Sequence, residues 1–193
     1  MKNLEKIKQI IAENNGILYT KDLKKYNIHR QYLKILEEKG EIYKVSQGIY
    51  ITPDKDISEF SIMSYRYKNG IFSHNTALYF YNLTDRTPMS IDITFPSNVR
   101  VKDDFIESHY IKPELHKLGL TEMKLEDGTK IKIYDLERTI CDIIRDRNKV
   151  DPQIFNTAIK EYFNLSQKNL QLLYKYAKEL KIDKILKKYM EVL

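Results

Sequence analysis

The N-terminal fold is decided by residues 27–52, which read NIHRQYLKILEEKGEIYKVSQGIYIT. Apolar residues recur at helical spacing in the first half of this stretch, and Gly40 marks the end of a helix. Two short runs rich in Ile, Tyr and Val follow, at Glu41–Val45 and Gly48–Thr52. The residues between the two runs suit a tight turn. The stretch therefore predicts a helix over residues 28–39, followed by a β-hairpin.

Two further helices are predicted upstream of this stretch. Apolar residues recur at helical spacing over Leu4–Ile11, before Gly16, and Thr20 can cap a short helix over Lys21–Tyr26. Three helices and a hairpin in this order are typical of a winged helix-turn-helix. We therefore predict a DNA-binding domain of this kind at residues 1–52.

The third predicted helix has the polarity of a recognition helix. Its basic residues lie toward the N-terminal half, and the acidic pair Glu37 and Glu38 lies toward the other end. A recognition helix presents its N-terminal residues to base edges, where Arg30 can pair with guanine and Gln31 with adenine. Phosphate contacts are expected from the start of the second helix and from the hairpin wing. The candidate DNA-contacting residues are Thr20, Lys21, His29, Arg30, Gln31, Lys34, Lys44 and Gln47. The alternative is a protein-interaction module, since winged helices also serve that purpose.

The charge distribution favours a polyanionic partner at both ends of the chain. The net charge is +6, and residues 1–52 and 141–193 each carry +4. Lysines spaced three or four residues apart form a basic stripe near the C-terminus. This stripe is either a solvated helix face or a second patch that faces nucleic acid or a toxin. Its members are Lys175, Lys178, Lys181, Lys184, Lys187 and Lys188.

From residue 53 onward the pattern changes to a mixture of strands and helices. Strands are predicted at residues 91–95, 99–101, 106–111, 121–125 and 130–134. Helices are predicted at residues 58–68, 74–82, 135–147, 151–163 and 166–180, and from residue 183. The fold class is therefore α+β, with an N-terminal winged helix-turn-helix and a mixed α/β domain with C-terminal helices at residues 53–193.

The sequence shows few signs of catalysis. It has no Gly-rich phosphate loop, its single cysteine, Cys141, lies beside an apolar stripe, and its four histidines lack metal-ligand spacing. We therefore predict no catalytic residue, no metal site and no cofactor. One enzyme-like pattern is Glu122-Met123-Lys124 on a strand, with acids such as Asp92 and Asp104 upstream, as in Mg²⁺-dependent nucleases. Alternating charge on a solvent-facing strand explains this pattern equally well.

Location is predicted from what the sequence does not contain. No apolar run approaches the ~18 residues that a membrane span needs. The charged N-terminus lacks the apolar block of a signal peptide. We therefore expect a cytoplasmic protein with no membrane partner.

Three blocks after the wing carry a family resemblance. They are Phe72–Leu78 (FSHNTAL), Leu83–Pro88 (LTDRTP) and Tyr134–Asp142 (YDLERTICD). Together with the winged helix they resemble the AbiEi-like antitoxins of type IV toxin–antitoxin, or abortive-infection, systems, over about residues 1–145. From the residues alone, we expect Arg138 and Asp142 to form a modest surface ion pair, because they are four residues apart on a helix.

The resemblance implies a function that the residue pattern does not itself give. It implies a non-enzymatic bacterial antitoxin of phage defence that binds inverted repeats upstream of its own operon and represses transcription. It also implies a nucleotidyltransferase-like toxin that is neutralised without a stable complex. One winged helix covers one half-site, so we expect a monomer or weak dimer that pairs on double-stranded DNA. The alternatives are a regulator of unrelated genes and a Mg²⁺-dependent nuclease with a DNA-targeting domain.

Overall fold

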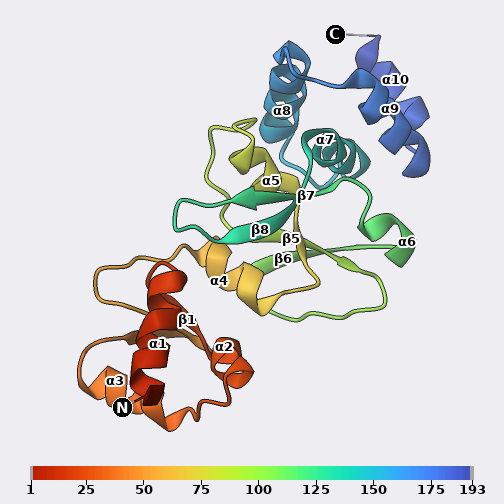
Figure 1. Ribbon diagram of the computed structural model, residues 1–193. Helices are drawn as coiled ribbons and strands as arrows, with labels where there is room; N and C mark the ends of the chain where they lie inside the picture. Colours follow the sequence, from red (N-terminus) through yellow and green to blue (C-terminus); the bar gives the residue numbers. More distant parts are fainter. Residues whose placement is uncertain (1, 192–193) are drawn as a thin grey trace. The chain divides into compact units, whose positions relative to one another are not determined.

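The computed structural model describes residues 2–191 and divides into two compact units (Figure 1). The first unit holds the described residues up to Arg66 together with Lys124–Thr129. The second holds Tyr67–Met123 and the described residues from Lys130 onward. Both units contain helices and strands, so the predicted α+β fold class is confirmed.

The first unit has the order of elements that defines a winged helix. A three-stranded antiparallel sheet, with strand order β1-β3-β2, packs beside the helices. Its core is an apolar cluster that includes Ile7, Leu18, Leu23, Leu36 and Ile42, all nearly inaccessible to solvent. The elements are α1 (Lys2–Glu13), β1 (Ile17–Tyr19), α2 (Thr20–Lys25), α3 (Gln31–Glu38), β2 (Tyr43–Ser46), β3 (Ile49–Ile51) and α4 (Glu59–Arg66).

Two predicted helix starts in this unit are wrong. The recognition helix α3 begins at Gln31 rather than residue 28, because Asn27 has a positive φ of 52° and the backbone N–H of Ile28 donates to the Leu23 carbonyl. Thr20 lies inside α2 instead of capping it. The short apolar run before α2 is a third strand, β1, which pairs with β3.

The second unit is built on a five-stranded mixed sheet with strand order β6-β5-β4-β8-β7. β4 is antiparallel to β5 and parallel to β8, while β5 and β6 are parallel. The strands are β4 (Ile71–Phe72), β5 (Ile91–Pro96), β6 (Ile106–Ile111), β7 (Leu120–Lys124) and β8 (Lys130–Tyr134). The helices are α5 (His74–Phe80), α6 (Pro113–His116), α7 (Leu136–Arg145), α8 (Pro152–Asn164), α9 (Leu170–Glu179) and α10 (Asp183–Met190).

Local signals placed several of these elements correctly. Asp135 caps α7 through the Arg138 N–H, and Asp151 caps α8, whose first residue is a proline. The predicted strand at residues 99–101 is wrong, because Val99 donates to the Pro96 carbonyl in a turn. The start predicted for α9 is also wrong, since Asn169 rather than Ser166 caps it.

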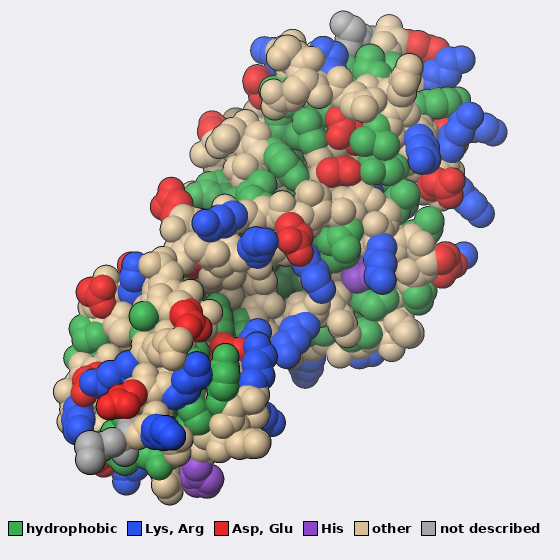
Figure 2. All heavy atoms as spheres, in the orientation of Figure 1, with side chains coloured by type: hydrophobic (Ala, Val, Ile, Leu, Met, Phe, Trp, Pro, Cys, Tyr) green, Lys and Arg blue, Asp and Glu red, His purple; other side chains and the backbone are tan. Residues whose placement is uncertain are grey.

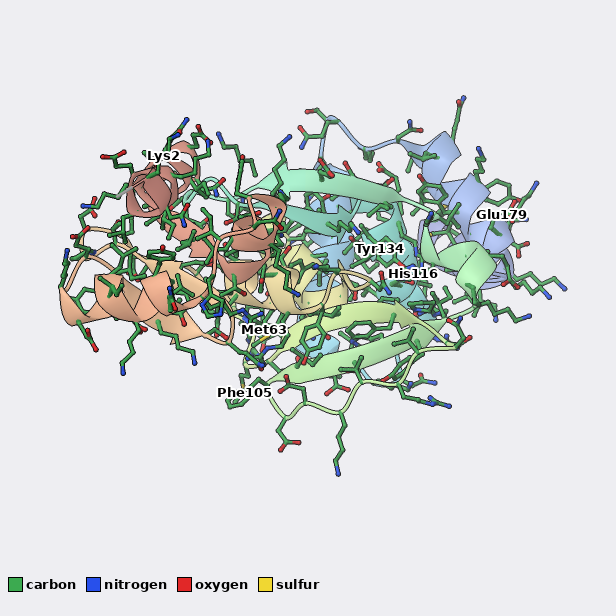
Figure 3. The ribbon with its side chains drawn as sticks, turned by 60° about the horizontal axis from the view of Figure 1, so that its bottom comes forward. Lys2, Met63, Phe105, His116, Tyr134 and Glu179 are labelled. Atoms are coloured by element: carbon green, nitrogen blue, oxygen red, sulfur yellow. The ribbon has the colours of Figure 1, made fainter. Side chains whose placement is uncertain are left out.

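Helix α7 lies at the centre of the second unit and contacts α5, α8, α9 and α10. Arg138 on this helix pairs with Asp142 as expected, but both side chains are fully buried, so the expected surface position of the pair is wrong. Its guanidinium donates to the Asp142 carboxylate at 3.0 Å and to two backbone carbonyls, and it lies 4.1 Å from the centre of the Tyr134 ring. The Tyr134 hydroxyl donates in turn to the His116 carbonyl at 2.8 Å (Figure 3). The polar side of α7 is therefore part of the core.

Candidate nucleic-acid interface

A groove of about 670 Å³ lies on the first unit, lined by residues of α2, α3, the β2–β3 wing and α4. We call it the wing groove. Five of the eight predicted DNA-contacting residues line it, namely Thr20, Arg30, Lys34, Lys44 and Gln47. They come from three separate segments of the sequence, so the fold brings together side chains that the sequence only suggested as a set.

The other three predicted residues are exposed but do not line the wing groove. The Lys21 ammonium lies 4.9 Å from the ring centres of both Tyr19 and Tyr65, and these two rings stack on each other. The Nδ1 atom of His29 accepts a hydrogen bond from the backbone N–H of Gln31, the first residue of α3. His29 therefore helps to fix the start of the recognition helix.

The basic side chains of the wing groove form few and weak ion pairs within the protein. Arg30 and Lys44 form no ion pair with any residue that the structure describes. Lys34 lies 3.8 Å from Glu38, but both side chains are exposed, and such pairs contribute only about 0.3–0.5 kcal/mol. All three cations are therefore available to an anionic ligand at little cost.

Two further residues that sequence reasoning missed shape the wing groove. Glu37 contributes a carboxylate to its lining, and Tyr50 contributes a hydroxyl. Burial raises the pKa of Tyr50, and the nearby Glu37 carboxylate adds to this effect. Tyr50 therefore stays a neutral phenol that can donate a hydrogen bond. The sequence spacing of Glu37 and Tyr50 did not predict that they would line the wing groove.

The wing turn is held against the start of α2. The Thr20 N–H donates to the Gly48 carbonyl at 2.9 Å. Gly48 has a φ of 81°, and a Cβ there would lie 2.9 Å from the Thr20 hydroxyl. Glycine is therefore required at this turn, and the wing has a fixed position relative to α2.

These observations can be compared with known proteins. Residues 5–53 match the family model described as transcriptional regulator, AbiEi antitoxin. The matched segment begins inside α1, runs through β3 and contains every predicted DNA-contacting residue. The family resemblance is thus confirmed for this segment, which lies outside the three motif blocks, and the match indicates a transcriptional regulator.

Outside residues 5–53, similarity to known proteins is limited to the fold. The crystal structure of the RV2827C protein from Mycobacterium tuberculosis is similar, with a TM-score of 0.59 and 14% sequence identity. The similarity covers 89% of this chain and 69% of that one. At this identity the likeness shows the fold alone. No curated protein matches the chain.

The six lysines of the predicted basic stripe all lie exposed on α9, α10 and the turn between them. Figure 2 shows Lys and Arg side chains gathered over these two helices. Lys187 lies 4.0 Å from Glu191, and Lys178 lies over the Tyr174 ring. The stripe is thus a solvent-facing, positively charged surface.

In the part of the chain that is described, no helix has the length and apolar character needed to span a membrane.

The nuclease-like residues do not come together. Glu122 is exposed on β7, whereas Asp92 is buried on β5, and two strands lie between β5 and β7 in the sheet. Strands lie about 4.8 Å apart, so these carboxylates are too distant to share one ion.

Among the described residues, one group of His, Cys, Asp and Glu side chains has its potential ligand atoms within 4.8 Å of one another. It consists of His74, His109 and Asp146.

Proposed function

We propose that this protein is a type IV antitoxin that represses its own operon and counteracts a nucleotidyltransferase-like toxin indirectly. In this proposal residues 1–52 bind inverted repeats upstream of the operon, and residues 53–193 are required for neutralisation without a stable toxin complex. The observation that carries the DNA-binding part is the wing groove, where Arg30, Lys34 and Lys44 gather from separate elements. The AbiEi match of the same segment supports repression as the outcome.

The proposed mode of binding follows from the arrangement of the elements. α3 enters the major groove with its N-terminal end first, so Arg30 and Gln31 reach base edges. Lys44 and Gln47 on the wing contact the backbone or the minor groove. Thr20 and Lys21 at the start of α2 contact phosphates that fix the register.

Inverted repeats require two copies of the winged helix, one for each half-site. We propose that the protein is a monomer or weak dimer in solution and pairs on the DNA in the cytoplasm. The lysine stripe of α9 and α10 is proposed as a second basic surface, which contacts either the same DNA or the toxin.

Binding of the full chain to its own upstream DNA tests this function. A labelled duplex of that region and a scrambled duplex of equal composition are titrated across a salt series, with wild type, Lys34→Ala and Lys24→Ala. Lys24 is an exposed lysine of α2 that does not line the wing groove, so it matches the charge change. We expect selective, salt-sensitive binding that Lys34→Ala weakens and Lys24→Ala leaves nearly unchanged.

Equal and weak binding to both duplexes by the wild type would contradict the proposal. The positive charge would then act only as a polyelectrolyte, and the winged helix would be better explained as a protein-contact module. Selective binding to DNA from other loci, with none upstream of the operon, would favour a regulator of unrelated genes.

A further inference from the structure

Glu37 places a negative charge in the wing groove. Among the described residues that line the groove it is the acidic member, beside the cations Arg30, Lys34 and Lys44. Its side chain is exposed and forms no ion pair with any residue that the structure describes. The neighbouring Glu38 does not line the groove and pairs with Lys34 at 3.8 Å. Because a carboxylate repels phosphates, Glu37 weakens DNA binding unless a group of the DNA donates a hydrogen bond to it.

Glu37 lies on the same face of α3 as the predicted base-reading arginine. Spacings of three or four residues place several side chains on this face, and they all line the wing groove, namely Arg30, Leu33, Lys34 and Glu37. Burial raises the pKa of Tyr50 on β3, Glu37 raises it further, and Arg30 lowers it. The two opposite charges of this helix face therefore act on the same phenol.

α3 is short enough for both of its ends to lie over base pairs. Its 8 residues span about 12 Å, and the major groove is about 12 Å wide. Arg30 and Glu37 are separated by about 10.5 Å of helix, and successive base pairs lie about 3.4 Å apart. Glu37 therefore faces a base within about three base pairs of the one that Arg30 contacts.

A carboxylate distinguishes the four bases by what they present in the major groove. When ionised it only accepts hydrogen bonds, and the N4 amino group of cytosine is a donor there. Thymine presents the O4 acceptor and a methyl group, and guanine presents two acceptors, so neither base can donate to it. Adenine has the N6 donor, but the adjacent N7 acceptor repels the second carboxylate oxygen. Cytosine is therefore the base that this side chain fits best.

On the basis of the proposed operator binding, we propose that Glu37 is a specificity-determining residue whose carboxylate accepts a hydrogen bond from the N4 amino group of one cytosine in each half-site. The cations of the wing groove supply the attraction to DNA. Glu37 selects among sequences, because it weakens every complex that lacks the cytosine. A contact of this kind discriminates one base pair by about 5–100-fold.

The base preference of the full chain tests this role. Duplexes of the upstream region that carry each single base-pair change compete for wild type, Glu37→Gln and Glu38→Gln. Wild type should prefer cytosine at one position of each half-site by about 5–100-fold. Glu37→Gln should lose this preference in favour of adenine, which glutamine contacts through N6 and N7, and should bind a scrambled duplex more tightly. Glu38→Gln makes the same charge change outside the groove lining and should keep the cytosine preference.

The outcomes separate base recognition from general repulsion. The role of Glu37 is overturned if folded Glu37→Gln keeps the wild-type preference at every position, even where it binds all duplexes more tightly. It is also overturned if Glu38→Gln loses the cytosine preference to the same extent. Either result leaves operator binding intact, since the wild type still selects its own DNA. A wild type without sequence selectivity would overturn both the operator proposal and the role of Glu37.

Discussion

Arg30 and Arg138 show how differently the two units use the same side chain. Arg30 is exposed at the start of α3 and lines the wing groove. Arg138 is fully buried on α7, where carbonyls, a carboxylate and an aromatic ring surround its guanidinium. The first unit thus keeps the cations of the wing groove available to a ligand, whereas the second uses a motif arginine to stabilise its own core. A motif residue is therefore not by itself a binding residue.

The largest expected effect is at Arg138. Arg138→Ala leaves the buried Asp142 carboxylate with Arg145 as its remaining cationic neighbour. It also removes a donor from each of two backbone carbonyls, one of which still accepts from a backbone N–H. Breaking a buried pair from one side costs about 3–5 kcal/mol, so we expect a large loss in the free energy of unfolding. Urea titration measures it. Arg30→Ala is the matched control, with a change within about 0.5 kcal/mol. Equal stabilities of the two variants would mean that Arg138 stabilises the fold no more than the exposed Arg30 does.

Asp146 gives a smaller effect that depends on pH. The hydrogen bond from His74 outweighs the opposing effect of burial and, with Arg145, holds the pKa of the Asp146 carboxyl well below its usual range. A lowered carboxyl pKa stabilises the fold above the unfolded pKa of about 3.9, and this contribution is lost as pH falls below it. At pH 7, Asp146→Asn should cost about 1.5–3 kcal/mol, the value of a charged hydrogen bond.

The pH dependence of that cost is measured by urea unfolding at several pH values. The difference between wild type and Asp146→Asn should shrink steadily from pH 5 toward pH 3. Asp104→Asn alters an exposed carboxylate of the same unit and should show no such trend. A difference that stays constant with pH would mean that the carboxylate charge contributes nothing.

The role of Arg30 in the first unit is tested by its effect on DNA binding. Arg30→Ala should cost about 1–3 kcal/mol of binding free energy and should relax the preference at one base pair. Competition among operators with single-base changes measures both quantities. Uniform loss on every sequence would show that Arg30 contacts phosphate instead of a base.

Lys44 on the wing gives the smallest expected effect. As a backbone contact, Lys44→Ala should weaken binding on all sequences alike and reduce the slope of log K against log salt by about 1. The slope is obtained from titrations at several salt concentrations. A change in base preference instead would mean that the wing reads sequence.

The sequence predicted the winged helix well because its signals are local. Gly16, Gly40 and Gly48 all have positive φ at the turns where the pattern placed them. The basic face of the recognition helix was also visible in the helical spacing. The groove itself was not visible, because its lining also includes Tyr50 of β3 and Tyr65 of α4, which only the fold brings together with Arg30.

The second unit was less predictable because its chemistry depends on long-range contacts. β4 has only two residues and exists because β5 and β8 pair on either side of it. His74 and His109 are 35 positions apart, and their approach follows from the sheet, where Thr94 and His109 are register partners. Helical spacing placed Arg138 on the polar side of α7 but could not show that other helices cover that side.

A protection footprint on the upstream DNA tests the central claim most directly. We predict two protected half-sites related as an inverted repeat, with centres about 10–10.5 base pairs, or a multiple of that, apart. Arg30→Ala should lose the footprint at a protein concentration where Lys24→Ala retains it. Uniform protection without half-sites, or an unchanged footprint with Arg30→Ala, would contradict operator recognition through the wing groove.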